Sequence, residues 1–245
     1  MKHLALIGYP LQHSFSKKYF ERLFKDNGIT YYDYSLLELT VLDGIKEIVA
    51  QHLLCGFNIT APFKQQIIPH LDNISAEAQT IGAVNCVRIK NNKWYGYNTD
   101  WQAFMQTLNP WTDRIKDSLA LILGTGGAAR AVAYALRKMN IEYRMVSRWP
   151  SKDACFISYD AAKQLMQAQH TLLVNATPIG MYPHIDASPW PYMEIIDKCT
   201  LVYDLIYNPS QTLLLRAASS ANIPICNGLD MLHIQADYSW KIFQL

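Results

Sequence analysis

The sequence has little excess charge and no concentration of basic residues. Its 22 Lys and Arg against 20 Asp and Glu leave a formal net charge of +2, and no basic run is longer than Lys17-Lys18. Because binding to phosphate backbones needs a concentrated basic face, nucleic acid is not expected as a partner. Of the 245 residues, 50% are hydrophobic, which excludes intrinsic disorder and predicts one large or two modest globular domains. A small molecule is the expected partner.

Cysteines are few and form no pattern. They are odd in number, widely separated and without a CxxC pair: Cys55, Cys86, Cys155, Cys199 and Cys226. Neither a disulfide framework nor a zinc site is indicated by this spacing. We therefore expect no metal and a reducing compartment.

Long hydrophobic runs are also missing. The longest stretch without Asp, Glu, Lys or Arg, residues 164–185, contains Gln, Asn, Thr, His and two prolines, so it cannot span a membrane. Pro10 and Gln12 interrupt the apolar run near the start before any small-residue cleavage site, which argues against a signal peptide. We expect a cytosolic protein with no membrane partner, as a monomer or a homodimer.

Short apolar runs alternate with helical patterns along the first hundred residues. Strands are predicted at 4–8, 31–36, 56–60, 84–89 and 94–97, with a turn at 91–93 between the last two. Helices are predicted at 16–27, 41–53 and 75–81, and from Pro62 onward, since proline suits a first helical turn. Strands that alternate with helices predict an α/β fold.

The second half alternates more regularly. Strands are predicted at 119–123, 141–146, 171–175 and 201–205, and helices at 128–139, 159–169 and 211–221. This order predicts a Rossmann-type parallel sheet with helices on its faces. The boundary between the halves is expected near 100–111. The last segment has apolar residues at the spacing of one helix face: Leu229, Leu232, Ala236, Trp240 and Phe243.

A glycine-rich turn joins a strand and a helix of the second half. Gly124, Gly126 and Ala129 fit the dinucleotide fingerprint, in which the first allows the turn, the second admits a pyrophosphate and the third lets helix and strand pack closely. An ordinary tight turn is the alternative, but the strand before and the helix after favour a cofactor site. The next strand ends in Ser147-Arg148 instead of an acidic residue. Unless Arg148 is only a solvated surface charge, it favours NADP over NAD.

Four polar clusters end the predicted strands of the first half. They are residues 13–16, 58–64, 83–85 and 98–100. Taken singly, each has a structural interpretation: serines as helix caps, Asn58 and Asn85 as turn residues, and Asp100 as an N-cap. Together they supply the hydroxyls, amides, lysine and carboxylate that a polyhydroxylated, charged ligand needs.

With these clusters and the glycine turn, essentially the whole chain resembles the shikimate dehydrogenase family. The matching motifs are GYPLQHSFS (8–16), GFNITAPFK (56–64), GAVN (82–85), GYNTD (96–100), NATPIGM (175–181), DLIYNP (204–209) and NGLDML (227–232). The resemblance implies two α/β domains around a cleft. Residues 1–100 would bind substrate and carry catalysis, with the C-terminal helix 228–245 packed back on them, and residues 101–227 would bind NADP.

The resemblance also assigns residues to each site. Lys64 and Asp100 would form the catalytic pair. Residues that would contact substrate are Ser14, Ser16, Thr60, Asn85, Asp100, Tyr207 and Gln235. Residues that would line the NADP site are Gly124, Thr125, Gly126, Gly127, Ala128, Ser147, Arg148, Leu205 and Gly228.

The sequence departs from the family pattern at two places. Lys17 follows the second serine, where the family usually has proline. Trp149 follows Arg148, where the family usually has threonine. Because the second departure lies in the phosphate loop, Lys152 is a second candidate partner for the phosphate.

The reaction that the resemblance implies is the reversible, NADP-dependent reduction of 3-dehydroshikimate to shikimate, in aromatic amino-acid biosynthesis. Reducing a ketone leaves an alkoxide that must receive a proton. Lys64, just inside the helix predicted from Pro62, is the candidate because the helix dipole there disfavours an ammonium. Asp100 would orient Lys64 and the substrate hydroxyl. His13 titrates near neutral pH, but shaping the loop that carries Ser14 is its favoured role.

Two alternative functions stay open at this point. One is a quinate/shikimate dehydrogenase of the same family that uses NAD or NADP, although the two serines Ser14 and Ser16 favour shikimate by resemblance. The other is a catalytically silent NADP-binding regulator. The presence of both Lys64 and Asp100 argues against a regulator, because a sensor needs neither.

Overall fold

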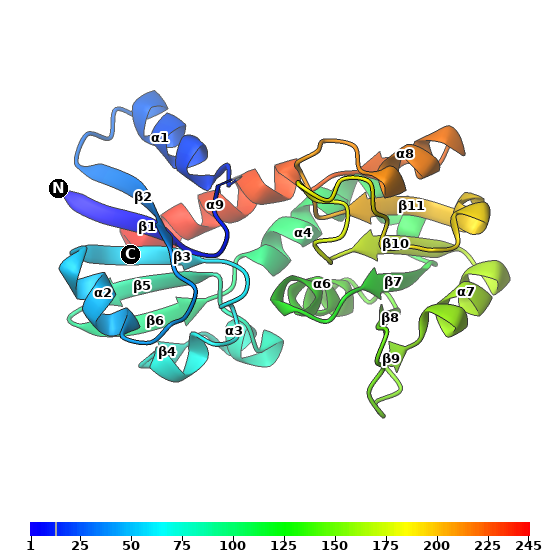
Figure 1. Ribbon diagram of the computed structural model, residues 1–245, viewed down its shortest axis with the longest axis horizontal. Helices are drawn as coiled ribbons and strands as arrows, with labels where there is room; N and C mark the ends of the chain where they lie inside the picture. The colour runs from blue at the N-terminus through cyan, green and yellow to red at the C-terminus, as the bar shows by residue number, and fades with distance from the viewer. Residues whose placement is uncertain (13) are drawn as a thin grey trace. The chain divides into compact units, whose positions relative to one another are not determined.

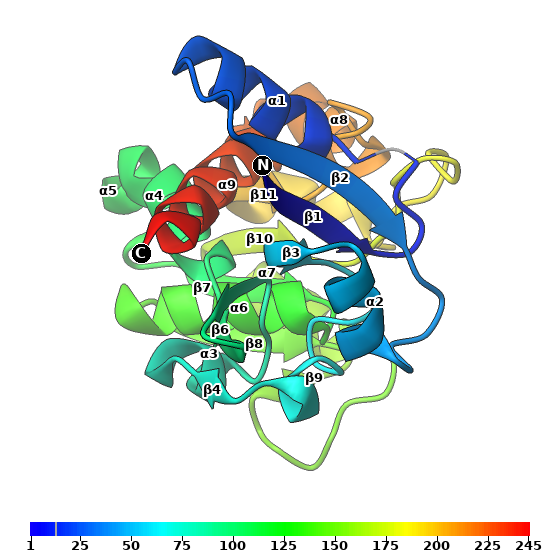
Figure 2. The same cartoon turned by 90° about the vertical axis from the view of Figure 1, so that its left-hand side faces the viewer.

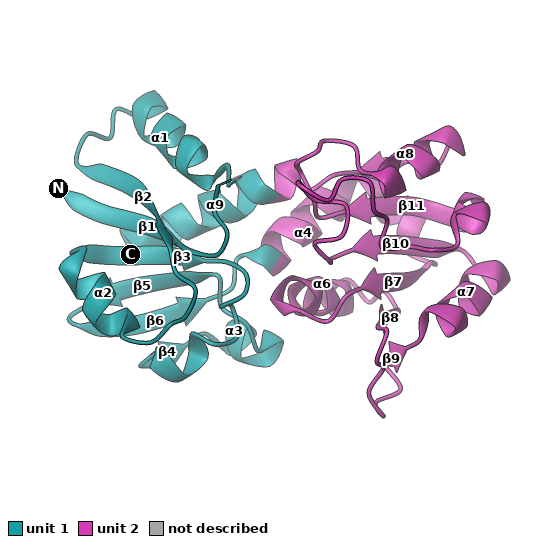
Figure 3. Cartoon of the chain, viewed as in Figure 1, with its two compact units in different colours: residues 1–100, 232–245 teal, residues 101–231 magenta. Residues whose placement is uncertain are grey.

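A computed structural model describes residues 1–12 and 14–245 of the chain. The chain divides into two compact units (Figure 3): unit 1 comprises Met1–Asp100 and Leu232–Leu245, and unit 2 comprises Trp101–Met231. Each unit is built on its own six-stranded sheet, and helices alternate with the strands along the chain. The predicted α/β fold class is confirmed.

Unit 1 contains a mixed sheet in the order β2-β1-β3-β5-β6-β4. Its strands are β1 (Lys2–Gly8), β2 (Tyr32–Glu38), β3 (Leu54–Ile59), β4 (Asn73–Ile74), β5 (Cys86–Lys90) and β6 (Lys93–Tyr97). β1 runs parallel to β2 and β3, whereas β5 runs antiparallel to both β3 and β6. The hairpin between β5 and β6 turns at Asn91 and Asn92, whose φ values of 53° and 56° suit a two-residue hairpin turn.

Alternate residues of β1 pack on opposite faces of this sheet. The helices of the unit are α1 (Ser16–Asp26), α2 (Ile45–Gln51), α3 (Ala76–Ile81) and most of α9 (Leu229–Gln244), with the short 3-10 helix η1 (Ile68–His70). Leu4 and Leu6 belong to the core cluster that α1 and α9 cover, while Ala5 and Ile7 belong to the cluster that α2 covers. Figure 2 shows α1 and α9 on one side of β1 and α2 on the other. Burial on both faces explains the uninterrupted apolar run of β1.

The helix predicted from Pro62 is wrong. Residues 61–67 form successive turns, and only the three residues of η1 that follow are helical. The backbone N–H of Val84 donates to the carbonyl of Lys64 at 2.8 Å, while Ile68 N–H bonds to Gln65. The carbonyl that an α-helix would use is therefore bonded to another segment of the chain. Lys64 does not lie in the first turn of an α-helix, so the predicted dipole effect on its ammonium does not apply.

Unit 2 contains an all-parallel sheet in the order β12-β11-β10-β7-β8-β9. Its strands are β7 (Leu119–Leu123), β8 (Tyr143–Val146), β9 (Phe156–Ile157), β10 (Thr171–Asn175), β11 (Cys199–Asp204) and β12 (Ile225–Cys226). The chain continues to β8 on one side of β7 and to β10 on the other. A reversal of this kind is where doubly wound sheets bind ligands, at the carboxyl ends of the strands. The predicted Rossmann-type sheet is confirmed.

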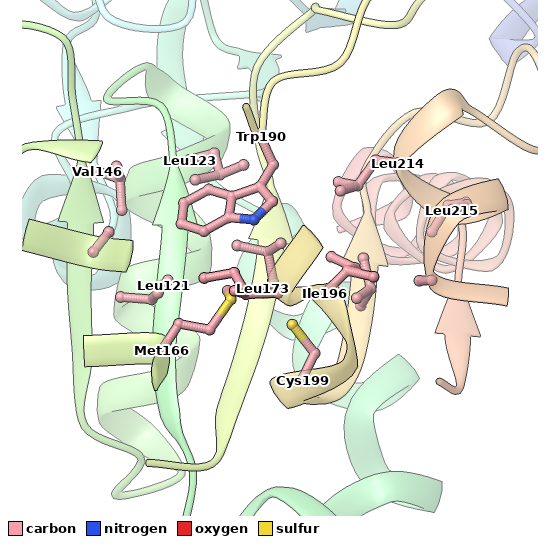
Figure 4. Close-up of a cluster of buried hydrophobic side chains, with 14 of the residues drawn as sticks. Leu121, Leu123, Val146, Met166, Leu173, Trp190, Ile196, Cys199, Leu214 and Leu215 are labelled. Atoms are coloured by element: carbon pink, nitrogen blue, oxygen red, sulfur yellow. The ribbon is translucent and has the colours of Figure 1, made fainter. Parts of the chain in front are cut away.

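Helices cover both faces of the second sheet. They are α4 (Asp100–Leu108), α5 (Thr112–Ile115), α6 (Gly127–Lys138), α7 (Tyr159–Ala168) and α8 (Leu213–Ser220), with the 3-10 helices η2 (Asn109–Trp111) and η3 (Met193–Lys198). On one face, α7, α8 and η3 enclose a cluster around Trp190, which is 0% exposed (Figure 4). Val202 of β11 belongs to this cluster. The next residue, Tyr203, packs on the opposite face against Phe104 of α4, with 5.0 Å between the ring centroids. Trp101 of α4 in turn contacts Tyr134 of α6.

The segment expected as a boundary, 100–111, is largely helical. α4 begins at Asp100, whose backbone N–H bonds to the side-chain oxygen of Asn98 at 3.0 Å. Asn98 therefore takes the capping role that the sequence suggested for Asp100, and the Asp100 carboxylate is left for other partners. Short strands such as β4, β9 and β12 were not predicted, because two residues show no periodicity.

Across the described residues, no helix has both the length and the apolar character needed to cross a membrane. All five cysteines are free thiols. The described side chains also include no cluster of three or more His, Cys, Asp or Glu that could hold a metal ion.

Candidate functional site

The polar clusters of unit 1 meet at one edge of its sheet. The end of β3 pairs with the start of β5, which pairs with the end of β6, and β1 ends beside β3. The segments that leave or enter the sheet at this edge carry Thr60, Lys64, Asn85 and Asp100. Because β5 runs antiparallel to β3 and β6, its start lies beside their ends. Asn85, which precedes β5, therefore lies at the same edge as residues that follow β3 and β6.

Lys64 and Asp100 form an ion pair at this edge. Nζ of Lys64 lies 2.6 Å from Oδ2 of Asp100. The side chain of Asp100 is 6% exposed and that of Lys64 is 18% exposed. Separating the two groups would leave a charge in a largely buried place without its partner. The ion pair therefore favours one arrangement of the two side chains. The arrangement keeps an ammonium group, partly open to solvent, in one position.

The side-chain amide of Asn85 fixes the other carboxylate oxygen. Its Nδ2 donates to Oδ1 of Asp100 at 2.8 Å and to Oγ1 of Thr99 at 2.9 Å, while its Oδ1 accepts from the Thr99 backbone at 2.8 Å. Asn85 is 2% exposed, so these bonds are shielded from water. A longer bond, 3.4 Å, runs from Nδ2 to Oε1 of Gln235 on α9. The predicted substrate ligands Asn85 and Gln235 therefore lie beside the ion pair.

A buried layer beneath Asn85 supports this network. Asn58 lies inside β3 and is 5% exposed, so its interpretation as a turn residue is wrong. Its Nδ2 donates to Oγ of Ser239 at 2.8 Å and to the Asn85 carbonyl at 3.1 Å, and its Oδ1 accepts from the Tyr34 hydroxyl at 2.9 Å. Burial raises the pKa of Tyr34 well above its ordinary value, so the phenol remains a donor.

Tyr34 and Ser239 were not singled out from the sequence, and Thr99 was noted only as a member of the cluster 98–100. Ser239 follows Gln235 by four residues on α9, and its hydroxyl donates to the Gln235 carbonyl at 2.9 Å. A search for polar residues one helical turn from Gln235 could have found it. Tyr34 gives no comparable signal, because an aromatic residue in a strand usually belongs to the core.

The remaining substrate candidates lie in segments after β1, β3 and β11. Oγ of Ser14 accepts from the Ser16 backbone at 3.3 Å, and Ser16 begins α1. The N-cap of α1 is Phe15, so neither serine takes the capping position suggested for them. Thr60 N–H bonds to the Ile7 carbonyl at 2.9 Å, which fixes the loop after β3. Tyr207 belongs to unit 2 and follows β11, and His13 lies outside the described residues.

In unit 2, the glycine turn connects β7 to α6. Gly124 has φ of +109°, which favours glycine, and a Cβ added there would lie 3.1 Å from the Thr177 side chain. Gly126 is the N-cap of α6, with no heavy atom within 4 Å of an added Cβ. Ala129, in the third place of the fingerprint, is 0% exposed and packs α6 onto the sheet.

The first turn of α6 has the features of an anion site. It has no side-chain cap hydrogen bond and no acidic residue. Gly124 and Thr125 lead to the N-cap Gly126, and Gly127 and Ala128 begin the helix. Unbonded N–H groups at the positive end of a helix dipole attract a phosphate group, so the chain's own chemistry fits a dinucleotide here.

The phosphate-loop candidates follow β8, the strand next to β7. Gly124 N–H donates to the Val146 carbonyl at 3.1 Å, so the glycine turn and the segment from Ser147 onward leave the sheet side by side. Arg148 and Lys152 are both exposed. Burial raises the pKa of Tyr159 at the start of α7, and the positive charge of Arg148 partly offsets this effect.

Leu205 and Gly228 approach each other closely at the end of β11. A Cβ on Gly228 would lie 1.9 Å from the Leu205 carbonyl oxygen, so only glycine fits. The preceding residue, Asp204, is 0% exposed and accepts hydrogen bonds from Asn175 at 2.9 Å and Thr212 at 2.7 Å. Burial raises the pKa of Asp204 to about 6, although these donors favour the ionised form. Asp204 and Asn175 belong to matching motifs of the sequence, but neither was assigned a role from it.

Comparisons with known proteins agree with this geometry. Residues 6–87 match the family described as the shikimate dehydrogenase substrate binding domain. A shikimate dehydrogenase (NADP(+)) from Methanocaldococcus jannaschii is 37% identical, with 99% of this chain and 91% of that protein covered. One from Clostridium beijerinckii is 35% identical, with 100% and 94% covered.

Solved structures give the same result over both units. A shikimate dehydrogenase from Peptoclostridium difficile has a TM-score of 0.90 and 34% identity, covering 100% of this chain and 92% of that chain. The enzyme from Thermus thermophilus, solved in complex with NADP(H) and shikimate, has a TM-score of 0.84 and 31% identity, covering 99% and 93%. Since similarity at this level extends over nearly all of both units, the chain belongs to the shikimate dehydrogenase family.

Proposed function

We propose that this chain catalyses the reversible, NADP-dependent reduction of 3-dehydroshikimate to shikimate, a step of aromatic amino-acid biosynthesis. The observation that carries the proposal is the Lys64–Asp100 pair, with 2.6 Å between Nζ and Oδ2 and an Asn85 bond to the second carboxylate oxygen. The relatives named as NADP-dependent shikimate dehydrogenases support the choice of substrate and cofactor.

Lys64 is the proposed proton carrier. When the ketone is reduced, the oxygen becomes an alkoxide, and a positioned ammonium donates the proton that it needs. In the reverse direction the neutral amine accepts the proton of the hydroxyl. The structure supports this role because Lys64 is held at both ends. Asp100 binds its ammonium group, and the Val84 N–H binds its backbone carbonyl.

Asp100 is the proposed orienting group. Its two oxygens bond to Lys64 and Asn85, which fixes the plane of the carboxylate. A carboxylate held in this way can also accept a hydrogen bond from the reacting hydroxyl and align it with Lys64. Replacing the carboxylate with an amide would keep the shape but weaken the hold on the ammonium.

The other substrate contacts are proposals from the resemblance. Ser14, Ser16, Thr60, Asn85, Tyr207 and Gln235 would bind the hydroxyl and carboxylate groups of shikimate. Asn85 and Gln235 have the best structural support, because their amides lie beside the ion pair. Hydroxyl and amide groups suit a polyhydroxylated ring, since each ring hydroxyl can both donate and accept.

NADP would be held by unit 2. The glycine turn at 124–128 would line the pyrophosphate, with the N–H groups at the start of α6 as donors because that of Gly124 is bonded to Val146. Ser147, Arg148 and Lys152 would line the 2′-phosphate, and Leu205 and Gly228 the nicotinamide end of the site. The bound nicotinamide supplies or accepts the hydride. Arg148→Ala should raise KM for NADP far more than KM for NAD, because only NADP carries the 2′-phosphate. Equal effects on KM for NADP and KM for NAD would show that Arg148 is only a surface charge.

Initial rates test the proposed function. The purified chain is assayed with shikimate and with quinate, each with NADP and with NAD, and we expect the highest kcat/KM for shikimate with NADP. A higher kcat/KM for quinate would favour the quinate alternative. NADP binding without turnover of either substrate would favour the silent regulator.

Lys64→Ala tests the assignment of the proton carrier. We expect kcat to fall by about 10²–10⁴-fold, the usual contribution of a positioned acid or base, with a small change in KM. Lys25→Ala, which removes an exposed lysine from α1, is the matched control. A thermal melt checks that both variants are folded. Near wild-type turnover in Lys64→Ala would remove Lys64 from the mechanism.

We place the enzyme in the cytosol as a monomer or a homodimer. Five free thiols support a reducing compartment, since disulfides are rare there. Sedimentation velocity at several protein concentrations would decide between the two oligomeric states.

A further inference from the structure

Trp149 is the most exposed tryptophan of the chain. It is 86% exposed, whereas Trp94, Trp190 and Trp240 are all at or below 9% and the two others are half-buried. Tryptophan is normally withdrawn from water because of its large apolar surface. Figure 1 shows the segment between β8 and β9 as a loop that projects from the sheet. An indole this exposed leaves most of its flat face available to a ligand.

The backbone that carries this indole is held in place. Trp149 N–H donates to Oγ of Ser147 at 3.1 Å, and Ser147 N–H donates to the Ile157 carbonyl of β9 at 3.0 Å. Pro150 follows, and a proline restricts the residue before it to extended conformations. The side chain is therefore exposed on a backbone with little freedom, which lowers the entropy cost of binding a ligand.

The position of this loop is set by the parallel pairing of β7 and β8. Leu123 pairs with Val146, so the glycine turn and the loop at 147–149 start at the same edge of the sheet. A dinucleotide with its pyrophosphate at the start of α6 has its adenosine ribose at the end of the next strand, here β8. The exposed Arg148 is the candidate there for the 2′-phosphate. The adenine is attached to that same ribose, next to residue 149.

We propose that the indole of Trp149 stacks on the adenine ring of NADP and contributes to cofactor affinity, an inference that rests on the proposed function. Aromatic rings stack on bases through their flat faces, and this contact does not depend on hydrogen bonds. Arg148 binds the 2′-phosphate and Trp149 the base, so two neighbouring residues read two groups on one ribose. Trp149 thereby adds a contact that the smaller threonine usual at this position cannot make.

Binding of cofactor fragments tests the proposal. The probes are 2′,5′-ADP, which carries the adenine and the 2′-phosphate, and nicotinamide mononucleotide, which carries neither. We expect Trp149→Ala to raise Kd for 2′,5′-ADP by about tenfold, within the range for stacking of one base, and to leave Kd for nicotinamide mononucleotide unchanged. Trp149→Phe should restore most of the affinity. Leu53→Ala, which truncates another exposed apolar side chain, 74% exposed and in unit 1, is the matched control.

Tryptophan fluorescence gives a signature that a structural role would not produce. Adding 2′,5′-ADP should quench the red-edge emission of the wild-type chain, and the quench should be absent in Trp149→Ala. Wild-type Kd in Trp149→Ala, or equal weakening for both probes, would overturn the proposal. Failure of the proposed function is recognised separately, as fragment binding by a wild-type chain that does not turn over shikimate.

Discussion

Replacing Gly126 with alanine should separate cofactor binding from folding in unit 2. The φ of −75° and ψ of −176° are ordinary for any L-residue, and an added Cβ has no heavy atom within 4 Å. Alanine is a poorer N-cap than glycine by about 0.5–1 kcal/mol. Alanine also lowers the conformational entropy of the unfolded chain, which stabilises the folded state by about 0.4–1 kcal/mol. The two contributions nearly cancel, so the free energy of unfolding should change by less than about 1 kcal/mol.

Cofactor binding responds differently to the same methyl group. In the proposed NADP site, the open space at Gly126 is where the pyrophosphate would reach the N–H groups of α6. A methyl group in that space would push the pyrophosphate away from the helix. At least one charge-assisted hydrogen bond would then be lost, at a cost of about 1.5–3 kcal/mol. Since 1.4 kcal/mol is a factor of ten, Kd for NADPH should rise by about tenfold or more.

The matched control for this variant is Gly228→Ala. There the added Cβ would lie 1.9 Å from the Leu205 oxygen and 2.5 Å from its carbonyl carbon, so the backbone must separate. Overpacking of this kind costs about 1–3 kcal/mol or more. Urea unfolding followed by circular dichroism measures stability, and calorimetric titration measures NADPH binding. A Gly126→Ala protein that binds NADPH as tightly as the wild type, or that unfolds as readily as Gly228→Ala, would contradict these expectations.

Further predictions concern α9 and a buried carboxyl. Gln235→Ala should weaken shikimate binding by about tenfold or less, the loss of one hydrogen bond, with NADPH binding unchanged in calorimetry. Trp240→Ala should instead cost about 3–5 kcal/mol in unfolding, since the ring is 9% exposed in the core; equal melting temperatures of the two variants would contradict this. Burial raises the pKa of Asp204 to about 6 from an ordinary 3.8, so the folded state binds this proton more tightly. The free energy of unfolding should therefore fall by about 3 kcal/mol as pH rises from about 4 to about 6 and then level off, and Asp204→Asn should abolish that slope in urea titrations.

The sequence was informative where chemistry and local geometry coincide. The glycine turn lies between a strand and a helix, and both are local patterns, so Gly124 and Gly126 could be assigned from the sequence alone. The clusters that contain Lys64, Asn85 and Asp100 stood out as polar groups at strand ends, but their roles came from the resemblance to the family. Their meeting at one edge depends on the reversal of β5, which the Asn91–Asn92 turn indicates.

Other features depend on contacts between distant segments and could not be read from the sequence. Pro62 suggested a helix, but the Lys64 carbonyl is bonded to Val84, twenty residues later, and local preference yields to that bond. Asn58 looked like a turn residue because asparagine is common in turns. It occupies the middle of the sheet because Tyr34 and Ser239 satisfy its amide, and neither partner is near it in sequence.

The division of unit 1 into two stretches of chain sets an order of events during synthesis. Residues 1–100 leave the ribosome long before 232–245, and the segment in between is the whole of unit 2. At about 5–20 residues per second, roughly 10–30 s pass before Trp240 and Phe243 can cover the cluster that contains Phe20 and Tyr34. Unit 2 can complete its core first, while the part of the first sheet's face that α9 covers stays exposed beside α1. A chaperone that binds nascent chains would find its target on that face during this interval.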